Sequence, residues 1–312
     1  MKKNDICAKL GNIEQLAGIR EVRHSATNMR LIEVWNGRLQ FTVLADQGFD
    51  IGPLSLDGKN RVFLAKGGLA HRTEGDILGG LFFTCGPDNV GPAEGKLPMH
   101  GSFRTTPATH ISTCAQWVGE AYRLTVCGEV RHASLFGGNV VLRRTIETEY
   151  GSTELTVTDT ITNEGFTPWP LMLLYHINAG YPLLDEGVEI RLPERKSYLR
   201  ETRQLVADSE WNRMPAPAAG AAERVYYHEG IRGHAQLQVW NETAGEGMTV
   251  SYDAAQLPVL TQWISPMAGD YALGLEPGTC HVERLSGEAK WNGPEVLQAG
   301  ESKQIDLKIA FS

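Results

Sequence analysis

The sequence has few cysteines and no long hydrophobic run, and each shortage excludes a class of protein. The five cysteines among 312 residues are scattered, odd in number and form no C-x-x-C pair. We therefore expect reduced thiols in a cytoplasmic protein, rather than a disulfide framework or a zinc site. No apolar run approaches the roughly 20 residues that a membrane span requires, and no apolar stretch follows the basic first residues. We expect neither a secretory signal nor a membrane location.

Positive charge is also scarce. Lysine and arginine total 29 against 37 aspartates and glutamates, which leaves a net charge of −8. A nucleic-acid-binding protein needs clustered cations to neutralise phosphates, so this balance argues against nucleic acid as a partner. The chain is nonetheless 42% hydrophobic, which is ample for a core. We expect a soluble protein with a small or neutral ligand.

Familiar catalytic signatures are absent as well. The sequence contains no G-x-S-x-G, G-x-G-x-x-G, Walker phosphate loop or H-E-x-x-H. No motif therefore supports an α/β-hydrolase, a dinucleotide-binding protein, a P-loop nucleotide-binding protein or a zincin metalloprotease. The nine histidines include no close metal-type pair, since His228 and His234 are separated by glycines. We expect a site without a metal ion.

The sequence does contain a long series of strand patterns. Residues 154–163 alternate apolar side chains and Asp159 with threonines, which is typical of a half-exposed antiparallel strand. Asn36-Gly37 lies between two β-rich runs and predicts a hairpin. The 34 glycines and 15 prolines supply turns. Further strand-like runs occupy residues 122–127, 140–147, 171–177, 235–240, 248–252 and 304–311.

These patterns predict an all-β fold, a large antiparallel β-sandwich. Apolar side chains near helical spacing in residues 12–22 predict a short N-terminal helix. We therefore expect residues 1–25 to be a partly helical N-terminal extension, and residues 26–312 to be a single sandwich domain that carries the site. The proline- and alanine-rich stretch 214–222 is interpreted as a surface loop.

Three segments carry side chains that are unusual for a plain core. In residues 95–104, His100, Ser102 and Arg104 share one face if the chain is extended. The preceding segment, residues 79–89, is rich in glycine and can bring its backbone close to a ligand. For this region alone, an ordinary loop with a solvated arginine is the favoured alternative.

The second segment, residues 171–182, carries His176 and Asn178 on one face at the end of a very apolar strand. A buried imidazole costs free energy unless it is hydrogen-bonded. A core histidine bonded to backbone and a proton donor at a cleft are both open interpretations of His176.

In the third segment, residues 271–279, Ala272, Gly274 and Glu276 line one face. Pro277-Gly278 predicts a type II turn that ends the strand just after Glu276. A carboxylate above a floor of small residues has space for a ligand, whereas a solvated glutamate near a turn is the alternative.

In this order, His100 with Arg104, then His176, then Glu276 resemble the anchors of the aldose 1-epimerase (galactose mutarotase-like) superfamily. The resemblance extends over about residues 30–311, and the spacing of 76 positions from His100 to His176 is similar to that in the family. The sequence segments 84–91 and 175–185 look closest to a bacterial branch of this superfamily.

The resemblance implies a galactose mutarotase-like sandwich that interconverts the α and β anomers of a free aldose, without metal or organic cofactor. It implies that Glu276 is the general base for the C1 hydroxyl and that His176 is the general acid for the ring oxygen. His100 would polarise the C1–O5 region, and Arg104 would bind a sugar hydroxyl or a carboxylate.

Four further substrate contacts are inferred from the residues themselves. Asn178 shares a face with the general acid, Tyr175 and Trp263 are candidates for stacking on the sugar, and Asp88 is a candidate for contacting its hydroxyls.

The alternatives are a non-catalytic carbohydrate-binding sandwich and an epimerase of a sugar phosphate. Exposed sheet edges permit a homodimer without requiring one. A phosphate would call for a basic cluster assembled from Arg72, Lys96 and Arg104.

Overall fold

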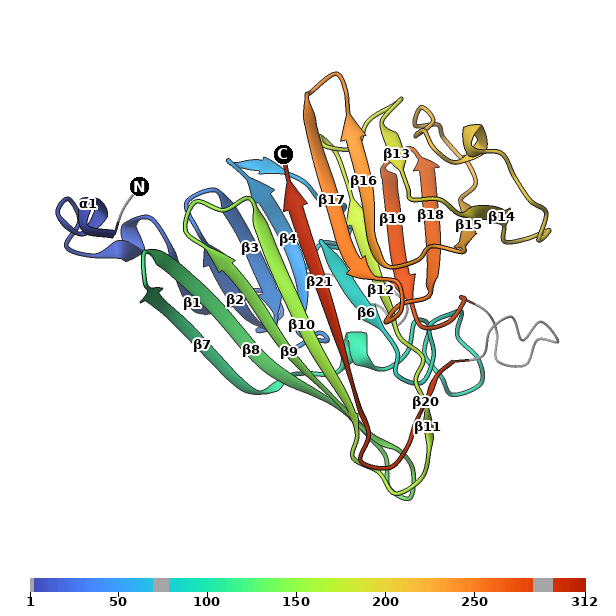
Figure 1. Cartoon of the computed structure of the whole chain (residues 1–312), viewed down its shortest axis with the longest axis horizontal. Helices are drawn as coiled ribbons and strands as arrows, with labels where there is room; N and C mark the ends of the chain where they lie inside the picture. Colours follow the sequence, from blue (N-terminus) through green and yellow to red (C-terminus); the bar gives the residue numbers. More distant parts are fainter. Residues whose placement is uncertain (1–2, 70–78, 283–293) are drawn as a thin grey trace.

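The computed structural model describes residues 3–69, 79–282 and 294–312. Two large sheets, in which every pair of neighbouring strands is antiparallel, and one two-stranded ribbon make up most of the regular structure (Figure 1). The prediction of an all-β antiparallel sandwich is confirmed. No helix in the described ranges is long and apolar enough to cross a membrane.

The larger sheet has eleven strands. From one edge to the other it contains β1 (Gly18–Arg23), β2 (Arg30–Trp35), β3 (Leu39–Leu44), β4 (Asp50–Leu56), β6 (Phe82–Cys85), β12 (Leu174–Ala179), β19 (Asp270–Gly278), β18 (Val259–Met267), β15 (Arg224–Glu229) and β14 (Lys196–Leu199), with β5 (Lys59–Asn60) paired to β4.

The second sheet has eight strands, and the C-terminal strand lies in its middle (Figure 1). Its order is β13 (Glu189–Arg191), β16 (His234–Asn241), β17 (Glu246–Asp253), β21 (Ser302–Phe311), β10 (Glu154–Asn163), β9 (Asn139–Glu149), β8 (Ala121–Ala133) and β7 (Thr109–Val118). The ribbon pairs β11 (Trp169–Pro170) with β20 (Val296–Leu297), and the helical pieces are α1 (Lys3–Cys7) and three 3₁₀ turns, η1 (Ile13–Gln15), η2 (Phe103–Thr105) and η3 (Asp208–Glu210).

The main core lies between the two sheets and follows from the alternation in the sequence. In β10, Leu155, Val157 and Ile161 are at most 1% exposed, whereas the threonines between them are partly exposed. The predicted hairpin joins β2 to β3, and Gly37 at its turn has a φ of 90°, which glycine adopts without steric cost. The expected runs lie in β8, β9, β16, β17 and β21, and residues 214–222 form a loop. The run expected at 171–177 is a strand only from Leu174, where β12 begins.

The predicted helix over residues 12–22 is wrong. Only η1 is helical there, and Gly18–Arg23 form an edge strand that pairs along its length with β2. Ile19 and Val22 are β-branched and favour a strand. A side chain at Gly18 would begin 2.6 Å from the Trp35 ring, so the glycine permits the close packing of β1. A short N-terminal helical segment is nonetheless present as α1, and β1 of the sandwich lies within residues 1–25.

A polar cluster buried between the sheets connects them. Arg144 on β9 donates hydrogen bonds of 2.8 and 2.6 Å to Asp159 on β10, and one of 2.8 Å to Asp50 on β4. The Tyr175 hydroxyl on β12 donates to the same Asp159 at 2.6 Å. These four residues are at most 2% exposed. Because buried charges are costly unless paired, each member of the cluster depends on the others.

Candidate active site

Two neighbouring strands of the larger sheet bring His176 and Glu276 together. Ile177 of β12 pairs with Leu275 of β19, so in this antiparallel register the histidine and the glutamate lie opposite each other. Nε2 of His176 is 3.0 Å from Oε1 of Glu276, and the two residues are 6% and 3% exposed. Since Ile177 and Leu275 belong to the main core, the pair lies on the face turned away from the second sheet.

The hydrogen bonds around His176 determine where its protons are. The Asn178 side-chain amide donates to the carbonyl oxygens of Gly80 and His176, so its Oδ1 is free to accept from His176 Nδ1 at 2.8 Å. Nδ1 therefore carries a proton. Nε2 is therefore the ring nitrogen that lies toward Glu276, 3.0 Å from Oε1.

One carboxylate oxygen of this pair lacks a hydrogen-bond partner from the described residues. Oε1 of Glu276 is buried and receives no aligned hydrogen bond within the described part of the chain, in spite of its proximity to His176. An unsatisfied buried acceptor is costly and calls for an explanation. A hydroxyl group donated by a bound molecule would satisfy it.

Two aromatic side chains fix the imidazole. Phe83 on β6 stacks on His176 with ring centroids 4.3 Å apart and planes at 20°, while Trp263 on β18 meets the same ring at 5.6 Å and 63°. The indole N–H of Trp263 donates to Glu223 at 2.8 Å, which holds the indole in place. Phe83 is a site residue that the sequence analysis missed, although it lies in the glycine-rich segment singled out there.

The absence of a side chain at Gly274 lets Glu276, His176 and Trp263 pack closely over β19. A Cβ atom on Gly274 would lie 2.6 Å from Glu276 Oε1, 3.0 Å from His176 Cε1 and 3.3 Å from Trp263 Cβ. Any side chain there would fill the volume next to both ionisable groups. The floor of small residues expected from the sequence is present on β19.

The predicted type II turn at Pro277-Gly278 is wrong, because β19 continues through both residues. Pro277 pairs with Leu260, and Gly278 pairs with Val259 and Leu174. A Cβ on Gly278 would lie 2.8 Å from the Leu173 carbonyl oxygen. Gly278 therefore allows close packing of the strands and does not form a chain-reversing turn. Glu276 lies inside the sheet.

The segment 95–104 is a loop, as the favoured alternative for this region had it, and not the extended chain that would place His100, Ser102 and Arg104 on one face. His100 has a φ of 62° and Gly101 one of 78°, and η2 follows directly. Gly86 N–H donates to the His100 carbonyl at 3.0 Å, and a Cβ on Gly101 would lie 2.3 Å from the Asn89 carbonyl oxygen. A positive φ at a histidine is sterically unfavourable, and these tight backbone contacts maintain it.

His100 reaches the site as a neutral acceptor. Its ring centroid is 5.9 Å from that of His176, and its Nδ1 is 2.9 Å from the Val90 carbonyl oxygen. A carbonyl only accepts, so Nδ1 carries the proton and Nε2 a lone pair. Burial, together with the nearby His176, lowers the pKa of His100 to about 3. His100 therefore accepts a hydrogen bond instead of polarising a ring oxygen by donation.

Asn178 and Tyr175 do not face a ligand as the sequence analysis expected. Both amide hydrogens and the carbonyl oxygen of Asn178 are used within the protein, so this residue orients His176. Tyr175 is 0% exposed and bonds to Asp159 in the core. Adjacent residues of a strand point to opposite faces, so Tyr175 cannot share the face on which His176 lies.

Asp88 and Arg104 shape the loop around His100. Asp88 Oδ1 accepts from the backbone N–H of Ser102 at 2.9 Å, and Arg104 Nε donates to the Met99 carbonyl at 2.9 Å. The Arg104 charge is close enough to contribute to the low pKa of His100. Of the basic cluster considered for a phosphate, Arg72 lies outside the described residues.

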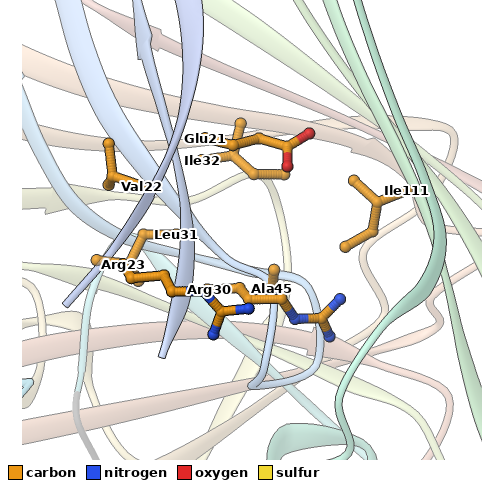
Figure 2. Close-up of a pocket in the computed structure, with 8 residues that line it drawn as sticks. All are labelled: Glu21, Val22, Arg23, Arg30, Leu31, Ile32, Ala45 and Ile111. Atoms are coloured by element: carbon orange, nitrogen blue, oxygen red, sulfur yellow. The ribbon is translucent and has the colours of Figure 1, made fainter. Parts of the chain in front are cut away.

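A separate pocket of about 420 Å³ opens at the far edge of the larger sheet. Figure 2 shows Ile111 of β7 across from Glu21 and Ile32 of β1 and β2. Its residue Arg30 is held by Asp46 and by the Ala108 carbonyl. None of the predicted site residues lines this pocket, and no group of three or more His, Cys, Asp or Glu side chains that could hold a metal ion occurs among the residues described.

The comparisons with known proteins establish a family and a fold. A model of the family described as "Domain of unknown function (DUF4432)" matches residues 26–311. A crystal structure of a "putative aldose 1-epimerase" from Klebsiella pneumoniae is 20% identical, has a TM-score of 0.82 and covers 96% of this chain and 86% of its own. A galactose mutarotase-like protein from Clostridium acetobutylicum is 13% identical, has a TM-score of 0.68 and covers 96% and 99%. No curated protein matches. At these identities the likeness shows the galactose mutarotase-like fold.

Proposed function

We propose that this chain, which belongs to the DUF4432 family, interconverts the α and β anomers of a free aldose. The observation that carries the proposal is the buried pair of His176 and Glu276, with 3.0 Å between Nε2 and Oε1. The O1 and O5 oxygens of a sugar ring are bonded to the same carbon, C1. Two groups at this separation can therefore serve both oxygens at once.

A proton on Nε2 of His176 allows a complete cycle. Oε1 of Glu276 takes the proton of the C1 hydroxyl while Nε2 of His176 gives its proton to O5. The C1–O5 bond breaks, and an open-chain aldehyde forms with a hydroxyl at C5. Rotation about C1–C2 and return of both protons close the ring as the other anomer. No electrons are exchanged, and each acid or base contributes about 100- to 10,000-fold.

The surrounding residues have supporting roles in this proposal. Asn178 positions His176 through its Nδ1–H. Nε2 of His100 accepts from a sugar hydroxyl, Trp263 packs against a C–H face of the ring, and Arg104 binds a hydroxyl at the loop. Asp88 maintains the loop through Ser102.

Anomer exchange can be measured directly by NMR saturation transfer between anomeric protons. In a panel of free hexoses and pentoses, we expect the protein to increase the exchange rate of at least one sugar well above that in buffer, while the inactive His176→Ala variant does not. Binding of a sugar without any increase would instead identify a carbohydrate-binding protein.

Gly274→Ala tests the close packing of the pair against β19. The new methyl group would lie 2.6 Å from Glu276 Oε1, so the carboxylate must turn away or exclude the sugar. We expect at least a tenfold loss of exchange rate in a folded protein, since such small displacements of reacting groups are costly. Gly11→Ala is the control, because nothing lies within 4 Å of the added Cβ. Equal activity of both variants would contradict the assigned position of the sugar.

A further inference from the structure

Thr261 presents a second unsatisfied polar atom next to the His176–Glu276 pair. It lies on β18 directly opposite Glu276 of β19, and opposite residues of an antiparallel pair share one face with Cβ atoms about 4.5–5.5 Å apart. Thr261 is 1% exposed, and its hydroxyl has no hydrogen-bond partner anywhere in the described ranges.

A structural role does not account for this hydroxyl. The threonines of β10 alternate with its buried apolar residues and are partly exposed, whereas Thr261 is buried. Valine has the same shape and would avoid the cost of burying an unpaired hydroxyl. The orphaned Thr261 Oγ1 and Glu276 Oε1 therefore form one polar site that a ligand with hydroxyl groups completes.

The order of the strands indicates which hydroxyl this is. His176, Glu276 and Thr261 lie on the consecutive strands β12, β19 and β18, about 4.8 Å apart. In the proposed reaction, O5 faces His176 and O1 faces Glu276. Besides O5 and O1, the ring atom C1 is bonded to C2. The hydroxyl group on C2 therefore lies on the side of C1 away from O5, toward β18.

We propose that Thr261 hydrogen-bonds the C2 hydroxyl of the substrate and restricts the enzyme to aldoses that retain this group. The inference rests on the proposed anomer exchange and narrows its substrate class, because it excludes 2-deoxy sugars as preferred substrates. A site built to bond a hydroxyl discriminates strongly against the analogue that lacks it, since the buried protein group is then left unpaired.

Thr261→Val tests the assignment when it is measured with matched sugars. The probes are D-glucose with 2-deoxy-D-glucose, D-galactose with 2-deoxy-D-galactose and D-ribose with 2-deoxy-D-ribose. We expect the wild type to prefer the 2-hydroxy member of its pair at least tenfold in kcat/KM. In Thr261→Val this preference should fall below about threefold, through loss of activity on the 2-hydroxy sugar alone. Thr261→Ser retains the hydroxyl and should retain the preference.

Measurements of thermal stability and of sugar binding test the role of Thr261 separately from catalysis. The melting temperature of Thr261→Val should equal or exceed that of the wild type, because no protein partner is lost. If the wild type exchanges no anomers, the proposed function fails. The dissociation constants of the matched sugars then measure the preference for the 2-hydroxy sugar. An equal loss on both members of a pair, a wild type that prefers or equally accepts the 2-deoxy sugar, or the absence of binding to every probe would overturn the role of Thr261.

Discussion

Glu276→Gln is expected to reduce anomer exchange at least 100-fold while the protein remains folded. The glutamine amide has nearly the shape of the carboxylate but cannot take the proton from the C1 hydroxyl. Glu276 is 3% exposed and its Oε1 has no aligned partner in the part of the chain described. Because glutamine keeps the volume of the glutamate side chain, the packing around position 276 should be retained. Saturation-transfer NMR measures the rate, and circular dichroism measures the fold.

A surface carboxylate provides the control for this substitution. Glu154 is 45% exposed and pairs with Lys308, and Glu154→Gln should exchange anomers at the wild-type rate. The double variant His176→Ala/Glu276→Gln should lose much less than the product of the two single losses, because groups that act in one proton cycle are not additive. Wild-type rates in both single variants would show that the pair does not carry the reaction.

Arg144→Met is expected to lower the free energy of unfolding by about 3–5 kcal/mol, because it leaves two buried carboxylates without their cation. Asp50 and Asp159 are 2% and 0% exposed, and Arg144 contacts both. Urea unfolding of the folded variant measures the change. Arg143→Met is the matched control on the same strand, because Arg143 is 46% exposed and forms surface ion pairs, which typically contribute at most about 1 kcal/mol.

The loss in Arg144→Met should also depend on pH. Burial raises the pKa of Asp50 even with the arginine in place, and Arg144 opposes this rise, so without the arginine the pKa of Asp50 rises further. A group with a raised pKa in the folded state stabilises the fold below its unfolded pKa, and this contribution is lost as pH rises through the folded pKa. The deficit should therefore be smaller near pH 4 than at pH 7. A deficit under about 1 kcal/mol at pH 7 would contradict a cluster of interdependent charges.

Local patterns predicted most of the sheets, because successive side chains of a strand alternate between its two faces. The alternation in β10 and the glycine turn after Trp35 both appear in the structure as expected. The same local reasoning failed where two interpretations shared one pattern. Apolar residues in 12–22 fit a helix as well as a strand, and hydrogen bonds from β2 decided the outcome. Pro277-Gly278 fits a turn as well as a tightly packed strand, and the approach of Leu173 decided that one.

The sequence by itself determined the sandwich and supplied the histidines and the glutamate of the candidate site, because residue type and periodicity are properties of the chain alone. Only the tertiary structure placed His176 opposite Glu276, turned Tyr175 into the core and engaged Asn178 with His176. It alone also showed that the hydroxyl of Thr261 lacks a partner. Such facts depend on strand register and on contacts between residues far apart in the chain, and no local pattern contains them.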